Sequence, residues 1–165
     1  YSRFERSTHV IEERPNIENE PLRIGIDFNI GNTNAVIGLA IGDSMTIFDE
    51  INASYDTDTL AKEIKSRYPF NKIYIYPDAS GGNRSTNATK TDIQILESYG
   101  FVNQSAASNP PVRDRVNSVQ RLFEDGKGNR RLKIHNSAKK LIECLELQSY
   151  TEKGEPATES GLNYI

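Results

Sequence analysis

Three apolar segments joined by two short turn signals occupy residues 23–51, and they are the strongest constraint on the fold. The segments are 23–28, 35–40 and 45–51, and residues 29–34, rich in Asn and Gly, supply the first turn. The dipeptide Gly42-Asp43 between the second and third segments is typical of a tight hairpin. Strands with connections this short pair antiparallel. The sequence therefore predicts an antiparallel meander of three strands.

The pattern after residue 55 alternates between helix and strand. Asp56 or Thr57 can cap a helix that ends before Pro69, and a fourth strand is predicted over 72–78. Further helices are predicted over 92–99, over 110–123 and from Ser137, as its cap, to Leu147, with short strands over 102–105 and 131–134. This order predicts an α/β fold in which the three-strand meander is followed by helix–strand units, with a mixed central sheet and helices on both faces. It matches the ribonuclease H-like fold, and other mixed folds begin with the same order of elements.

Length and composition fit one globular domain. Residues 1–21 show little periodicity and are read as a lead-in from a preceding domain, and residues 22–165 as a single domain of ordinary size. No run of about 18 apolar residues is present, so no membrane helix is predicted. The single Cys144 fits a reducing compartment, and with two distant histidines it gives no zinc site.

The net charge of −3 hides an asymmetry along the chain. Residues 1–60 carry four arginines against eleven Asp and Glu, a net −7, whereas residues 113–140 carry nine Lys and Arg against three acids, a net +6. Such a division suits an enzyme that holds metal ions with one part and nucleic-acid phosphates with another. Ordinary surface scatter would produce it too.

Asp27 and Asp78 are the candidate site residues. Asp27 lies inside an apolar strand pattern, where a buried carboxylate needs a metal, an arginine or backbone donors as its partner. Asp78 ends the fourth strand. In a ribonuclease H-like sheet the first and fourth strands are neighbours, so the two carboxylates would face each other and repel unless a cation lies between them. Oxygen-rich sites of this kind suit Mg²⁺ or Mn²⁺. The alternative is that Asp27 pairs with an arginine and Asp78 only caps the loop.

Basic residues supply candidate contacts to DNA phosphates. They lie at a predicted helix start (Arg113, Arg115), around a turn and strand (Arg130, Arg131, Lys133) and in the loop after Asp78 (Arg84). The alternative is a solvated helix face and hairpin.

Other chemistries find no support in the chain. No phosphate-binding Gly-x-x-x-x-Gly-Lys loop and no Gly-x-Ser-x-Gly nucleophile motif occurs. His9 and His135 are expected to be surface or packing residues, and Tyr74 and Tyr76 core or edge residues of a strand.

Several blocks resemble the C-terminal nuclease domain of the tailed-phage terminase large subunit. These blocks are 1–10, 24–29, 76–81, 109–119 and 128–132 with His135, and they span almost the whole chain in order. The block 109–119 is the most specific of them. The resemblance implies a metal-dependent endonuclease that hydrolyses concatemeric double-stranded DNA during genome packaging by a two-metal mechanism. It carries over Asp27 and Asp78 as catalytic metal ligands for two Mg²⁺ or Mn²⁺ ions. Residues 159–165 resemble the lead into the motif of the third acid, which is therefore expected beyond Ile165.

The resemblance also implies the setting in which the domain works. It implies an ATPase domain that precedes residues 1–21 in the same chain, a terminase small subunit and portal as partners, no membrane, and action in the host cytoplasm. Two alternatives stay open: another ribonuclease H-like nuclease, of resolvase or integrase type, or a non-catalytic module that docks on DNA or the portal. Branched against linear duplex substrates would separate the first, and absence of a third acid would favour the second.

Overall fold

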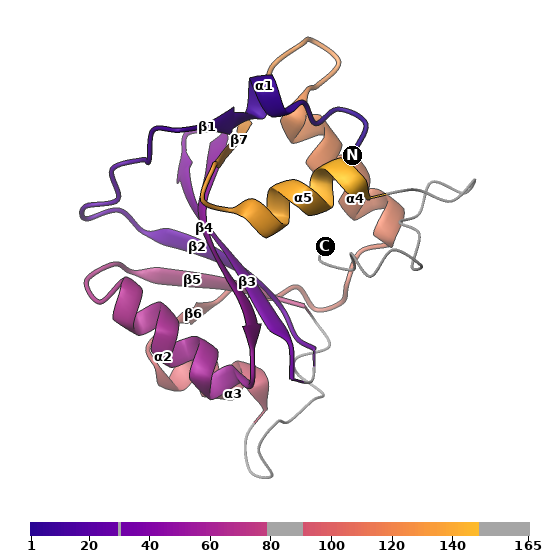
Figure 1. The fold of residues 1–165 in the computed structure, drawn as a ribbon. Coiled ribbons are helices and arrows are strands. Elements are labelled where there is room, and N and C mark those ends of the chain that lie inside the picture. The colour runs from indigo at the N-terminus through magenta and orange to yellow at the C-terminus, as the bar shows by residue number, and fades with distance from the viewer. Residues whose placement is uncertain (30, 79–90, 149–165) are drawn as a thin grey trace. The chain divides into compact units, whose positions relative to one another are not determined.

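The computed structural model describes residues 1–29, 31–78 and 91–148 of the chain. Its helices and strands, shown in Figure 1, are α1 (Arg6–His9), β1 (Val10–Ile11), β2 (Leu22–Asp27), β3 (Thr33–Ile41), β4 (Ser44–Ser54), α2 (Thr57–Arg67), β5 (Ile73–Pro77), α3 (Asp92–Ser98), β6 (Val102–Asn103), α4 (Val112–Phe123), β7 (Leu132–His135) and α5 (Lys139–Leu147).

The strands form a mixed sheet in the order β1-β7-β4-β3-β2-β5-β6. β2 pairs antiparallel with β3, and Gly42, with a φ of +60°, begins the tight turn between β3 and β4. β2 also pairs in parallel with β5, so the first strand of the meander adjoins the strand after α2. The antiparallel pairing of β2 with β3 and the parallel pairing of β2 with β5 confirm the predicted ribonuclease H-like arrangement.

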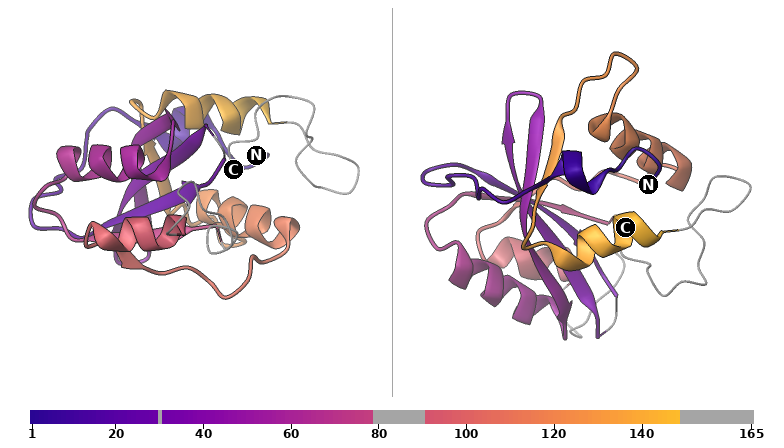
Figure 2. Two further views of the ribbon diagram at one scale, coloured as in Figure 1. Left: turned by 90° about the horizontal axis from the view of Figure 1, so that it is seen from below. Right: turned by 45° about the horizontal axis from the view of Figure 1, so that its top comes forward.

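The chain divides into two compact units, of which the second comprises residues 16–39 and 50–109. In this unit α2 buries Leu60 and Ile64 completely, and Asp56 caps it by accepting from the Thr59 amide at 2.7 Å. α3 begins with a capping box between Thr91 and Gln94. The two helices pack side by side (Figures 1 and 2).

The first unit comprises residues 1–15, 40–49 and 110–165. β7 pairs in parallel with β1 on one side and with β4 on the other. α4 buries Phe123 completely and Val116 nearly so, whereas Val112 is 40% exposed. α5 contributes Leu141, Ile142, Cys144 and Leu145 to the core of this unit.

Two local expectations were wrong or incomplete. Ser137 does not cap the last helix, which begins at Lys139 after Ala138; its hydroxyl instead donates to the Phe48 carbonyl at 2.9 Å. The sequence predicts no helix or strand within residues 1–21, yet α1 and β1 lie there. A strand of two residues and a helix of four are too short to show a periodic pattern.

Candidate functional site

Asp27 and Asp78 lie side by side at the carboxyl ends of two parallel strands. Asp27 ends β2, and Asp78 follows β5 directly. The register pairs Ile26 with Pro77, and the Asp78 amide donates to the Ile26 carbonyl at 3.1 Å, so the parallel pairing continues to the two acids. Neighbouring strands are about 4.8 Å apart. The structure therefore brings together the two carboxylates that the sequence analysis singled out.

Each of these carboxylates accepts a hydrogen bond from an asparagine amide. Asn29 Nδ2 donates to Asp27 Oδ2 at 2.8 Å, and Asn109 Nδ2 donates to Asp78 Oδ1. An amide donor stabilises the ionised form of a carboxylate and fixes its orientation. Neither asparagine is predicted from the sequence to be a site residue. Asn29 could have been found from its position two residues after Asp27, but nothing local connects Asn109 with an acid 31 residues earlier.

Asn34 lies opposite Asp27 on β3 and is 4% exposed. Its Oδ1 accepts from the Ala53 amide at 2.9 Å, and its Nδ2 donates to the Asn32 carbonyl at 3.0 Å. Ala53 has a φ of +56°, a left-handed conformation that is uncommon for a residue with a Cβ. Asn34 therefore holds this bend of β4 beside the acid pair.

The donor chemistry at the strand ends fits a divalent cation. Asp27 and Asp78 are both half-buried and offer hard carboxylate oxygens, which Mg²⁺ and Mn²⁺ prefer. Two anions this close repel each other, and a bound cation would remove that cost. Within residues 1–29, 31–78 and 91–148, no group of three or more His, Cys, Asp or Glu is arranged to hold a metal. The described part of the candidate centre thus consists of two acids.

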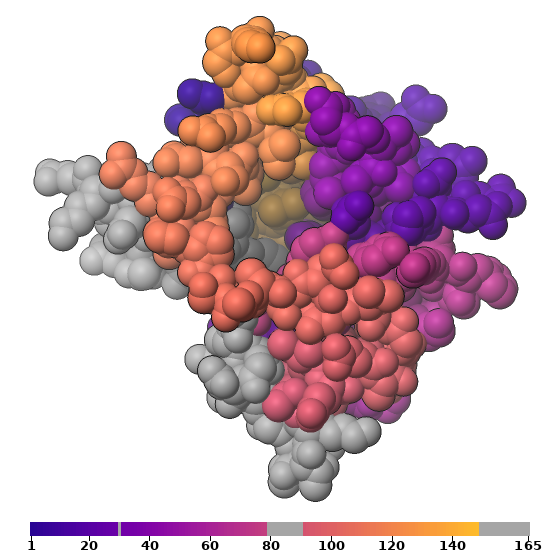
Figure 3. All heavy atoms as spheres, turned by 180° about the vertical axis from the view of Figure 1, so that it is seen from behind, coloured from indigo at the N-terminus to yellow at the C-terminus, as the bar shows by residue number. Residues whose placement is uncertain are grey.

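The predicted DNA-binding cations belong to the first unit, except Arg84, which falls outside the described residues. Arg113 and Arg115 are exposed in the first turns of α4, and no ion pair joins either of them to another described residue. Cations at a helix start oppose the helix dipole and do not stabilise the helix. Figure 3 shows the surface of α4 and of the following turn, in salmon and orange.

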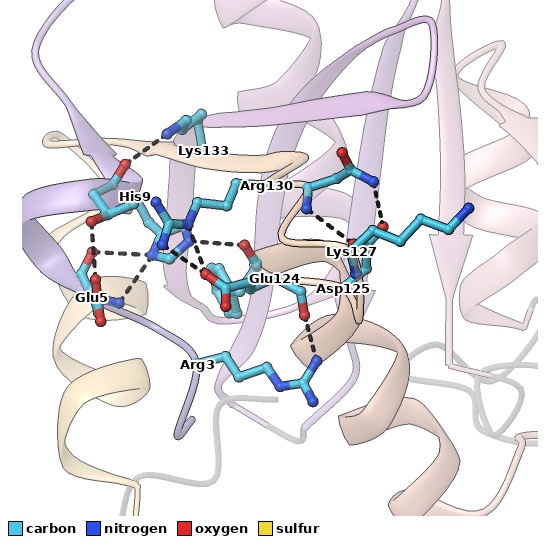
Figure 4. A network of polar contacts seen from close by, with 11 residues as sticks. Arg3, Glu5, His9, Glu124, Asp125, Lys127, Arg130 and Lys133 are labelled. Atoms are coloured by element: carbon cyan, nitrogen blue, oxygen red, sulfur yellow. Dashed lines mark hydrogen bonds and ion pairs between the residues drawn. The ribbon is translucent and has the colours of Figure 1, made fainter.

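Three other predicted cations have partners inside the first unit. Arg130 pairs with Glu124 at 2.7 Å, and Arg131 lies 3.4 Å from Asp125 and 3.8 Å from Asp43. Lys133 Nζ donates to the Thr8 carbonyl at 2.7 Å, as Figure 4 shows. These contacts tie the turn after α4 and the start of the chain to β7.

Asp125 organises the turn that carries Arg130 and Arg131. Its Oδ1 accepts from the Lys127 amide at 2.8 Å and the Asn129 amide at 3.0 Å, and its Oδ2 accepts from the Asn129 side chain at 2.9 Å. Hydrogen bonds from Asn129 and Lys127, with the Arg131 charge, lower the pKa of Asp125 from 3.8 to about 2.

Both histidines pack and bridge, in agreement with their predicted role. His9 is 1% exposed; its Nε2 bonds to the Phe123 carbonyl at 3.0 Å and its Nδ1 accepts from the Glu5 amide (Figure 4). His135 Nε2 bonds to the Glu12 carbonyl at 3.0 Å. The two rings attach residues 5–12 to α4 and β7.

Several solved structures have a fold similar to that of this chain. No protein-family profile matches the sequence, and no curated protein matches it. Among solved structures, the P22 large terminase nuclease domain has a TM-score of 0.70 at 14% identity, over 94% of this chain and 81% of that one. The large terminase of a thermophilic bacteriophage has the same TM-score and identity over 95% of this chain, but this chain covers only 40% of that protein.

The nuclease domain of the bacteriophage SPP1 large terminase, solved with bound Mn, has a TM-score of 0.58 at 14% identity, over 90% of this chain and 83% of that one. None of the described helices combines the length and apolar composition that a bilayer crossing requires. The chain has the ribonuclease H-like fold of large terminase nuclease domains.

Proposed function

We propose that the chain is the metal-dependent endonuclease domain of a viral terminase large subunit, which cuts concatemeric double-stranded DNA during genome packaging. The observation that supports this most strongly is the pairing of β2 with β5, which sets Asp27 beside Asp78. The likeness to nuclease domains of P22 and SPP1 terminases supports the same assignment. The chain covers only 40% of the large terminase of the thermophilic bacteriophage. We therefore include in the proposal an ATPase domain in the same full-length chain. The proposal also includes the terminase small subunit and the portal as partners, and action in the host cytoplasm.

Asp27 and Asp78 would hold the divalent cations. Two Mg²⁺ or Mn²⁺ ions bound there would supply Lewis-acid stabilisation of the scissile phosphate and a more acidic attacking water. The third acidic ligand is proposed to lie beyond Ile165. Asn29 and Asn109 would help to orient the two carboxylates, because each donates a hydrogen bond to one oxygen of its acid.

Arg113 and Arg115 would hold the DNA backbone through its phosphates. Contacts of this kind position DNA without reading its bases, so weak sequence preference is expected. Arg130, Arg131 and Lys133 have partners in the first unit and would contribute mainly by keeping the turn after α4 in place.

A plasmid-cleavage assay tests the proposal. The full-length protein is incubated with supercoiled plasmid and Mg²⁺, Mn²⁺ or chelator, and Asp27→Asn and Asp78→Asn are compared with it. Losing a ligand to a catalytic metal removes several kcal/mol of transition-state stabilisation. Each variant should therefore cut at least about a thousandfold more slowly, while DNA binding in chelator stays nearly unchanged.

The same assay separates the alternatives. Preference for a four-way junction over linear duplex would indicate a resolvase-type nuclease. Absence of metal-dependent cutting together with absence of Mn²⁺ binding would indicate a docking module. Retained cutting by either Asp variant would show that the acid pair is not the metal centre.

A further inference from the structure

One face of the β2–β5 pair carries a row of side chains that begins at the acid pair. Along β2, Leu22, Ile24 and Ile26 are buried, at 0%, 0% and 5% exposure, and the residues between them point to the opposite face. The register sets Arg23 beside Tyr74 and Gly25 beside Tyr76. The face therefore contains, in successive steps, the two acids, then Gly25 with Tyr76, then Arg23 with Tyr74.

Arg23 and Lys72 are held on this face by the two tyrosine rings. The Arg23 guanidinium lies 5.9 Å from the centroid of each ring, and it donates to the Tyr76 hydroxyl. Lys72 Nζ lies 5.0 Å from the Tyr74 centroid. Both cations are exposed, and no ion pair joins either of them to a described carboxylate. Aromatic faces orient cations without neutralising them, so both charges stay available to an anion.

We propose that this face, formed by Arg23, Lys72, Tyr74 and Tyr76, is a binding track for the sugar-phosphate backbone of the DNA strand being cut. This inference rests on the proposed nuclease function and adds a strand-binding surface to the same site. Arg23 and Lys72 would contact phosphates, and the hydroxyl of Tyr76, a residue that is 37% exposed, would donate to a phosphate or sugar oxygen.

Distance and charge favour a nucleic-acid strand as the occupant. Arg23 is four residues from Asp27, about 13 Å along a β-strand. Phosphates recur about every 3.4 Å of helix axis on each strand, so Arg23 would meet a phosphate only a few nucleotides from the one held at the acids. Arg23 and Lys72 lie on the same face as the proposed metal centre, and a polyanion could contact both cations and the bound metal.

Gly25 keeps the middle of the track low. It lies between Asp27 and Arg23 and carries no side chain, and an added Cβ there would lie 3.3 Å from Val36 Cγ2. Between the acids and the cations, the surface of the track is therefore formed by the β2 backbone at Gly25 and by the Val36 side chain next to it. Because these contacts involve only sugar and phosphate, the track would bind without sequence preference.

Fluorescence anisotropy of a labelled linear duplex, titrated in chelator over a low-salt series, tests the track. Arg23→Ala should weaken binding about tenfold, as expected for one charged hydrogen-bonding group, and should reduce the salt slope by about one. Arg23→Lys should retain the slope, because it keeps the charge. Lys65→Ala removes an exposed cation from α2 and should change neither quantity.

Failure of the track can be distinguished from failure of the proposed nuclease function. Unchanged affinity and slope in Arg23→Ala and in Lys72→Ala, or no duplex binding by the parent protein at low salt, would overturn the track and leave an Arg–Tyr cluster that only covers the sheet. Mn²⁺ titration reports on the acids independently, and Arg23→Ala should bind Mn²⁺ like the parent. If Arg23→Ala loses its circular-dichroism signal, Lys72→Ala, at an exposed position, carries the test.

Discussion

The two charged regions of the molecule use their charges in opposite ways. At the ends of β2 and β5, two like charges are placed together, and each accepts a hydrogen bond from an asparagine amide. In the turn after α4, Arg130 and Arg131 are each paired with a carboxylate of the same unit. Folding thus places like charges together in the first region and opposite charges together in the second.

The difference shows what a run of charges in a sequence does not reveal. Nine basic residues between positions 113 and 140 indicate a phosphate-binding surface, but the structure divides them by their partners. Arg113 and Arg115 are exposed at the start of α4, whereas Arg130 and Arg131 hold a turn. Like charges brought together at strand ends cost free energy, and this makes them a stronger sign of a ligand than the longer run.

Among the variants that test this comparison, the largest effect is expected from removing the amides that orient the acid pair. Asn109→Ala removes the amide donor to Asp78, and Asn29→Ala removes the donor to Asp27. Groups that orient metal ligands typically contribute ten- to hundredfold in metal affinity, so each variant should bind Mn²⁺ about ten- to hundredfold more weakly. Titration followed by the electron paramagnetic resonance of free Mn²⁺ measures this directly.

Asn71→Ala is the matched control for these variants. Asn71 also donates through its amide, but its acceptors are the backbone carbonyls of Ile17 and Glu20 and not a carboxylate. It should alter stability without changing Mn²⁺ affinity. Equal losses of affinity in Asn71→Ala and Asn109→Ala would show that the amides act through stability alone.

Most of the fold and the acid pair could be predicted because their signals are local or topological. Strand and turn patterns give the order of elements, and that order makes β2 and β5 neighbours, which brings Asp27 and Asp78 together. The Asn109 contact crosses 31 residues and leaves no trace in spacing. The same holds for Arg130 with Glu124, because only the tight turn over 125–129 decides which nearby acid each arginine meets.

The contacts within the track on β2 and β5 could not be predicted from the sequence either. Tyr74 and Tyr76 alternate along a strand, and this pattern predicts a core or edge position. Their contact with Arg23 depends on the register between two strands that lie about 50 residues apart in the chain, which alternation within one strand cannot give.

A smaller effect is expected on DNA affinity when arginines of the segment 113–140 are removed. Its size should differ between the exposed arginines of α4 and the paired arginines of the turn that follows. The double variant Arg113→Ala/Arg115→Ala should weaken binding of linear duplex DNA several-fold and reduce the salt slope by about two, one for each lost phosphate contact. Arg130→Ala should change the affinity less than about twofold, because its charge is already paired with Glu124. Anisotropy titrations at several salt concentrations compare them, and a larger loss in Arg130→Ala would contradict the division.

The smallest effect concerns the pH dependence of the turn at Asp125. Its pKa is depressed from 3.8 to about 2 by hydrogen bonds from Asn129 and Lys127, so the folded state favours the carboxylate. A depressed pKa adds stability that is fully present above the unfolded value and is lost as pH falls through the folded value. The contribution of Asp125 should therefore be constant from pH 7 to about 5, and it should decline between about 4 and 2.

Asp125→Asn isolates this contribution, because the variant keeps the shape of the side chain but cannot ionise. Urea unfolding of both proteins should show the parent to be more stable at pH 7, with the difference shrinking as pH falls below about 4. Other carboxylates titrate in both proteins and cancel in the difference. A difference that grows at low pH would mean that the turn does not hold Asp125 as a carboxylate, and the pairing that neutralises Arg131 would then have to come from Asp43, at 3.8 Å.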